Sequence, residues 1–172
     1  MNRPLLCSAL VASVLAGACS SDPTQGYSVT RPYRNDIQTV AVPVFNNTTF
    51  ARGMEVRLTE SVIGEIRRQT PWKVADASSA QTTLTGTITS SQMRVGSLGQ
   101  TTGLVEDQVV IVSIDFEWKD NRTGKVLVAR RQFQAVQSFV PAQGVQERIE
   151  LAQNATVQEL ARDLVAELRS SW

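Results

Sequence analysis

The stretch IQTVAVPVFNNTTFARGMEVRLTESVIGEIRRQTPWKV, residues 37–74, decides the fold because a strand, a turn and a helix follow one another in it. Its first part, Ile37–Phe45, is almost wholly apolar and rich in β-branched residues, which predicts a buried strand. Pro43 suits the end of a strand or a sheet edge, because it has no N–H to donate. Asn46–Thr49 then has the composition of a turn.

The second part of this stretch predicts an amphipathic helix over Met54–Gln69. Apolar residues recur there every four positions, with charged residues on much of the remaining surface, and the apolar ones are Leu58, Val62 and Ile66. Pro71 would end the helix. Trp72–Ala75 is a candidate for a short strand that follows it.

Three longer strands are expected next, over Thr82–Val95, Gln108–Trp118 and Val126–Phe139. In the second of these, alternate residues are apolar, which indicates one buried face. The segment Asp120–Lys125 between the last two is a hairpin turn, with Gly124 free to take a positive φ.

A long helix is expected at the end of the chain, over about Val145–Arg169, with a stripe of Leu, Val and Ala on one side. The predicted order is β-α-β-β-β-β-α within one domain over residues 36–172. This order indicates an α+β fold, with two helices packed on one face of a mostly antiparallel sheet.

The first residues are typical of an export signal, residues 1–18, because a short positive start precedes an apolar run too short to span a bilayer. Small residues lead directly to Cys19, which predicts cleavage before Cys19 and its acylation. A plain signal-peptidase site at Ala16–Ala18 is the alternative. Ser20 favours retention in the outer membrane. Residues 19–35 would then form the lipidated N-terminus and a flexible tether to the domain.

Composition excludes many functions. The chain has 172 residues and a net charge of +1, so nothing indicates a nucleic-acid binder. It has no histidine, and its two cysteines, Cys7 and Cys19, both lie in the first nineteen residues. The domain therefore lacks the usual general base, thiolate nucleophile and zinc ligands. No cofactor or metal site is expected.

Two groups of charged residues could still carry chemistry. Asp115 and Glu117 share one face of a predicted strand and could bind a metal or act in acid–base catalysis, although a solvated sheet face is the simpler explanation. Arg130 and Arg131 must point to opposite faces of their strand unless a bulge intervenes. With Arg94 they could form a basic site for phosphate or carboxylate groups, against the simpler alternative of ordinary exposed arginines.

The ordered set of motifs resembles the LPS-assembly lipoprotein family, LptE. The resemblance covers most of the chain that would remain after signal cleavage. It rests on a lipobox and a Gly-Tyr tether, a Pro-x-Phe strand end with an Asn-Thr-Phe turn, a Glu-x-x-Leu-Thr-Glu helix start, an L-x-G-x-I strand, a hairpin and the final helix. The residues that carry it are Gly26, Tyr27, Pro43, Phe45, Asn47, Thr48 or Thr49, Phe50, Glu55 or Glu60, Leu58, Thr59, Leu84–Ile88, Phe116–Asp120, Thr123, Gly124, Ala152, Asn154, Leu160, Ala161, Leu164, Val165 and Trp172.

The resemblance implies a fold of two helices on a four-stranded sheet, so that one predicted strand is not needed. It also implies a non-enzymatic lipoprotein, anchored through Cys19 on the periplasmic side of the outer membrane. Such a protein would plug and help to assemble a β-barrel translocon, and would assist delivery of lipopolysaccharide (LPS) to the cell surface. Its partners would be the barrel, LPS and the membrane. Basic residues near a strand bind LPS in the family, which here selects Arg94, Arg130 and Arg131.

Two other functions remain open from the sequence. The strand, Asn turn and helix at residues 37–69 are also similar to periplasmic lipoproteins that activate a cell-wall synthase or assemble a secretion pore. An enzyme that uses Asp115 and Glu117 is the third hypothesis, and the absence of histidine from the sequence counts against it.

Overall fold

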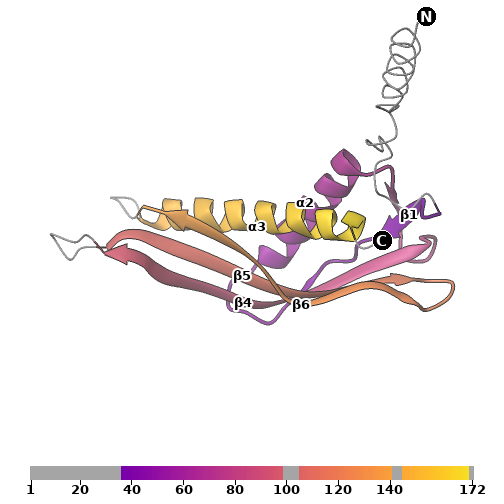
Figure 1. Cartoon of the computed structure of the whole chain (residues 1–172), viewed down its shortest axis with the longest axis horizontal. Coiled ribbons are helices and arrows are strands. Elements are labelled where there is room, and N and C mark those ends of the chain that lie inside the picture. The colour runs from indigo at the N-terminus through magenta and orange to yellow at the C-terminus, as the bar shows by residue number, and fades with distance from the viewer. Residues whose placement is uncertain (1–35, 99–104, 141–144, 171–172) are drawn as a thin grey trace, which may run out of the picture. The chain divides into compact units, whose positions relative to one another are not determined.

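The structure is a computed structural model that describes residues 36–98, 105–140 and 145–170. Its elements follow in the order β1 (Thr39–Ala41), β2 (Asn46–Asn47), α2 (Met54–Gln69), β3 (Lys73–Val74), β4 (Thr82–Leu98), β5 (Val105–Asp120), β6 (Val126–Phe139) and α3 (Val145–Ser170). The fold is mixed α+β, with two helices and one sheet, as the sequence predicts (Figure 1). The predicted signal segment 1–18, Cys19 and the tether up to residue 35 lie outside the described residues.

The sheet has six strands, so the expectation of a four-stranded sheet is wrong. Five strands lie in the order β3-β1-β4-β5-β6, and β2 also pairs with β4. The long strands β4, β5 and β6 are antiparallel. The three short strands run parallel to their neighbours, and two of them, β1 and β2, add to the same edge of β4. The expected and observed numbers of strands differ because β1, β2 and β3 have only two or three residues each, which is too short to show a sequence period.

The predicted first strand, Ile37–Phe45, is interrupted in the structure. Only Thr39–Ala41 pairs with the neighbouring strands, and pairing resumes at Asn46–Asn47. Pro43 lies in the gap and has no N–H for the ladder. The backbone N–H of Phe45 donates instead to the hydroxyl of Thr59 on α2, at 3.1 Å. The expected strand is thus reduced to Thr39–Ala41, and the second pairing segment lies in the predicted turn.

The core lies between the sheet and the helices. Both helices lie on the same side of the sheet (Figure 1). Alternate residues of β5 from Val110 to Trp118 are buried on that side, which confirms the predicted apolar face. Trp118 contacts Trp72, with ring centroids 4.9 Å apart, and Phe116 meets Phe133 edge-on. These ring contacts connect the strands to one another beneath the helices.

The two helices run side by side, and Arg169 at the end of α3 donates to the side-chain oxygen of Gln69 at the end of α2, at 3.2 Å. The bounds of α2 are those predicted from its four-residue spacing. Glu65 is an exception to the pattern, because it is buried although its position was expected to be solvated. Arg68 and Gln69 both donate to its carboxylate, which compensates its burial.

Candidate functional site

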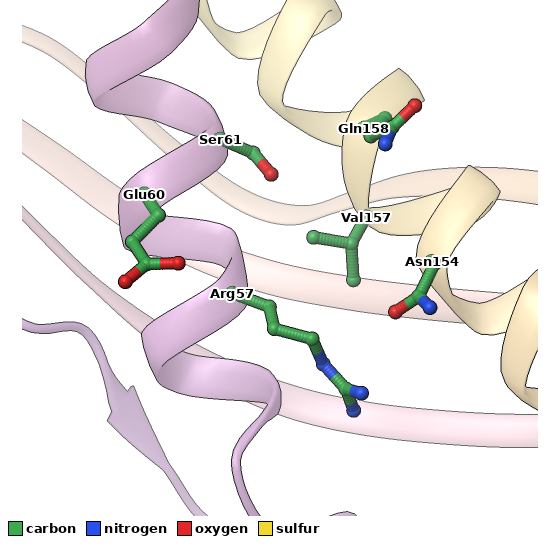
Figure 2. A pocket seen from close by; sticks show the side chains of 6 residues that line it. All are labelled: Arg57, Glu60, Ser61, Asn154, Val157 and Gln158. Carbon is green, nitrogen blue, oxygen red and sulfur yellow. The ribbon is translucent and has the colours of Figure 1, made fainter.

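A polar groove separates the outer sides of α2 and α3. Figure 2 shows Arg57 of α2 and Asn154 of α3 with their polar ends turned into the space between the helices. This cavity of about 400 Å³ is also lined by Glu60, Ser61 and Gln158. Among the described residues, the side-chain oxygen of Asn154 is buried without a hydrogen-bond partner. The groove therefore offers a cation, hydroxyl and amide groups to a polar ligand.

Sequence reasoning did not identify this groove. The only signal for it was the small residues Ser61 and Gly64 on the outer part of an otherwise long-chained helix. An added Cβ at Gly64 would meet no atom within 4 Å, so this side of α2 is open. A pattern on one helix cannot show that a second helix stands beside it, which is why the groove appears only in the structure.

Strand β6 contains a bulge at Arg131–Gln132, next to the predicted site residue Arg130. Ile114 pairs with Phe133, and Phe116 pairs with Arg130, so Asp115 alone faces both Arg131 and Gln132. Gln132 has a φ of 51°, in the left-handed region that non-glycine residues rarely adopt. Its backbone N–H donates to the Asp115 carboxylate at 2.8 Å. Asp115 thus stabilises the bulge, a structural use of a residue considered for catalysis.

The bulge leaves Arg130 and Arg131 pointing to different sides. Arg130 pairs with the inward-facing Phe116 and forms an ion pair with Glu167 of α3. Arg131 lines a shallow hollow on the open face of the sheet, together with Thr85, Glu117 and others, and Arg130 also borders this hollow. The two neighbouring arginines thus border one hollow, and they differ in that Arg130 is already paired with Glu167.

Arg94 lies far from both. It pairs with Val109, which in turn pairs with Ser138, seven residues beyond Arg131 on β6. At roughly 3.3 Å per residue, this separates Arg94 from Arg131 by about 20 Å along the sheet. Arg94 donates to the side-chain oxygen of Gln92 at 2.8 Å. The structure thus does not gather the three predicted arginines, and a role in binding LPS stays a prediction for each.

Among the residues that the structure describes, three carboxyl groups have shifted pKa values, and local contacts explain each. The pKa of Glu55 is lowered chiefly by the side chain of Asn47, which donates to it at 2.8 Å. The pKa of Asp120 is lowered chiefly by the backbone N–H of Thr123 in the hairpin turn. Partial burial, followed by the nearby Glu159, raises the pKa of Asp163. These groups are spread over the first turn of α2, a hairpin and α3.

The described ranges contain no cluster of three or more carboxylates that could hold a metal ion. They also contain no helix that is long and apolar enough to cross a bilayer. The carboxylates Asp115 and Glu117 stand on the outer sheet face with no third ligand beside them.

A family model described as "LptE: Lipopolysaccharide-assembly" matches residues 37–168, which is most of the chain. The match includes the six described strands, α2, and α3 except for its last two residues.

The chain belongs to the LptE lipopolysaccharide-assembly family.

The resemblance stated from the sequence is thereby confirmed. LptE proteins are non-enzymatic assembly lipoproteins, and this family membership makes the chain an LPS-assembly lipoprotein of the cell envelope. No curated protein sequence matches the chain significantly.

Solved structures show the same fold at low sequence identity. Rare lipoprotein B from Shewanella oneidensis is 17% identical, with a TM-score of 0.55, and the match covers 78% of this chain and 96% of that one. The hypothetical protein CT253 from Chlamydia trachomatis is 11% identical with a TM-score of 0.59, over 78% and 97% of the two chains. PelC, a dodecamer from Paraburkholderia phytofirmans, is 15% identical with a TM-score of 0.55, over 82% and 96%.

Proposed function

We propose that this LptE-family chain is the lipid-anchored partner of an outer-membrane β-barrel that exports LPS. It would occupy the barrel as a plug, assist the folding of the barrel and help to deliver LPS to the cell surface from the periplasmic side. Cys19 would carry the acyl chains, which anchor stably because each buried methylene contributes about 0.8 kcal/mol. The observation that carries the proposal is the family match over residues 37–168.

The described surface supports a protein partner more than a small-molecule substrate. The hollows on it are shallow and polar, and they lie between the helices and on the open sheet face. The open face carries Thr85 and Thr87 of β4 and Glu117 of β5, and both described helices lie on the other side of the sheet (Figure 1). A polar, rigid face of this kind suits contact with another polar protein surface.

The proposal is tested by co-purification. The full chain is tagged at its C-terminus, outer membranes are extracted in mild detergent, and bound proteins are identified and quantified by mass spectrometry. A large β-barrel protein recovered in near-equal amount is the expected result. A Cys19→Ala variant with an exported, non-acylated N-terminus is the control, and it should leave the membrane fraction. Recovery of the chain without a barrel would contradict the proposal.

A second candidate function is assembly of the chain into a ring of copies. It is suggested by the similarity to PelC, whose solved structure is a dodecamer. The likeness shows a shared fold, and a ring of copies would be its functional counterpart here. This candidate predicts a large assembly of the chain with itself. A cell-wall synthase as the main bound protein would instead select the activator role.

A further inference from the structure

One edge of the sheet has no neighbouring strand over part of its length. β1 pairs with β4 at Thr82–Thr83, and β2 pairs with it at Thr87–Ile88. The last link is the backbone N–H of Thr48, which donates to the carbonyl of Ile88 at 3.0 Å. Beyond this point, β4 pairs only with β5 within the described ranges. Within residues 36–98, 105–140 and 145–170, no strand therefore lies beside the outward backbone groups of Ser90–Val95.

This free edge has two chemically different faces. Met93 pairs with the buried Val110 and so lies on the helix side, as does Val95 two residues later. They are nonetheless 49% and 54% exposed, because α3 packs over β5 and β6 and does not cover β4 here. The opposite face carries Gln92 and Arg94, which are bonded to each other. The edge is thus apolar on one side and polar on the other.

The other edge of the sheet is built differently. β6 is interrupted by the bulge at Arg131–Gln132, next to the ion pair of Arg130 with Glu167. Bulges and charged residues are the features by which proteins prevent the addition of strands to an edge. Over Ser90–Val95 the register with β5 is regular, and the segment contains no proline or lysine and one charge, at Arg94. Register shifts flank it, between Ile88 and Ser90 and between Val95 and Ser97, so the run without such protection is these six residues.

From this edge we infer that β4 accepts an extended segment of the partner barrel protein as an added strand along Ser90–Val95. The inference rests on the proposed function, since the partner is the barrel named there. The segment would place apolar side chains beside Met93 and Val95, and an acidic side chain opposite Arg94. Acyl chains could cover the apolar side, but they cannot form hydrogen bonds with the outward backbone N–H and C=O groups of Ser90–Val95. A strand satisfies both requirements.

The test is site-specific photocrosslinking in intact cells with the full, tagged chain. A photoreactive residue replaces Met93 in one variant and Val136 in the other. Val136 is a matched control because it is 52% exposed and lies on β6, at the opposite edge. We expect crosslinks from position 93 to one short segment of the co-purifying barrel, about tenfold above those from position 136. Mass spectrometry of the linked peptide identifies that segment.

The other outcomes separate the two proposals. A barrel that co-purifies but links equally well or better to position 136 would overturn the strand addition and leave the proposed function standing. Links from position 93 to a second copy of the chain, or to LPS, would likewise overturn it. Absence of any barrel would remove the proposed function itself.

Charge at the edge gives a second, independent readout. Met93→Lys and Val95→Lys each place a cation on the apolar side of the edge, and Val136→Lys is the matched control. Each edge variant should lower the recovered barrel about tenfold, with an unfolding midpoint like that of the control. Unchanged recovery in both edge variants would contradict the inference, and two positions guard against one variant that fails to fold.

Discussion

At the scale of single residues, Asp115 shows how one carboxylate stabilises an irregular strand. It lies in the middle of β5 and accepts a hydrogen bond from the backbone N–H of Gln132. Gln132 has a positive φ, which costs conformational energy for a residue other than glycine. The bulge persists because this contact compensates part of that cost.

We therefore expect Asp115→Ala to lower the free energy of unfolding by about 1.5–2 kcal/mol, because it leaves the Gln132 N–H without its charged acceptor. Glu117→Ala, on the same face two residues later, is the control and should stay within about 0.5 kcal/mol of the parent. Urea unfolding followed by circular dichroism measures both. Equal losses in the two variants would show that Asp115 has no special role in the bulge.

Asp120 gives the hairpin turn a pH dependence. Its pKa is lowered in the folded chain, chiefly by the backbone N–H of Thr123. A lowered folded pKa means that the stabilisation is present above the unfolded pKa, near 3.9, and is lost as the pH falls through the folded value. Asp120→Asn should therefore make the free energy of unfolding depend less on pH below about pH 4. Above that pH, the dependence on pH should be the same as in the parent chain. Thermal unfolding between pH 2 and pH 7 tests this, and parallel acid limbs would refute it.

At the scale of elements, replacing glycine by alanine should have opposite effects on stability at two positions, one in β4 and one in α2. A Cβ at Gly86 of β4 would lie 3.3 Å from the carbonyl oxygen of Asp115 and from the buried ring of Phe45. Gly86→Ala should therefore destabilise the fold by about 1 kcal/mol. Gly64 lies inside α2 with open space around it, so Gly64→Ala should stabilise by about 0.5–1 kcal/mol. Denaturant unfolding measures the pair, and changes of the same sign would contradict the packing described here.

Most elements could be predicted because their patterns are long. The apolar spacing of α2 and the composition of β6 gave the bounds that the structure has. The hairpin after β5 also agrees, with Gly124 at a φ of 73°. Each of these segments is long enough to repeat its sequence pattern several times. Its secondary structure can therefore be predicted without knowing which elements pack against it.

The remaining features depend on contacts between distant residues. Asn46–Asn47 is a turn by composition, yet it pairs with β4 because the chain returns beside that strand. The bulge on β6 depends on Asp115, seventeen residues before Gln132. The burial of Glu65 and the groove beside it depend on the packing of α3 against α2. Local sequence patterns contain no information about such pairings.

At the scale of the whole molecule, the three arginines predicted to bind LPS differ in their surroundings and are not gathered at one place. Arg131 faces the open side of the sheet, Arg130 is bound to Glu167, and Arg94 lies about 20 Å away along the strands. A phosphate group would compete with the ion-paired Glu167 for Arg130, whereas in the described residues Arg131 forms no ion pair, and Asp115 and Glu117 only border the same hollow.

Arg131→Ala should therefore weaken LPS binding to the detergent-solubilised chain more than Arg130→Ala does. A loss of about fivefold, or roughly 1 kcal/mol, is expected for Arg131→Ala, together with a weaker dependence on salt. Fluorescence titration with labelled LPS at two ionic strengths measures it. A larger loss for Arg130→Ala would show that the ion pair with Glu167 opens to receive the ligand.

The central claim is that this chain acts with a barrel to deliver LPS to the cell surface. The most direct test is to deplete the chain from cells and to measure how much newly made LPS reaches the outer surface, with the amount of folded barrel measured in parallel. The account predicts that surface LPS falls as the chain is lost and recovers when the full chain is restored. Normal delivery of LPS, with the folded barrel unchanged after depletion, would contradict it.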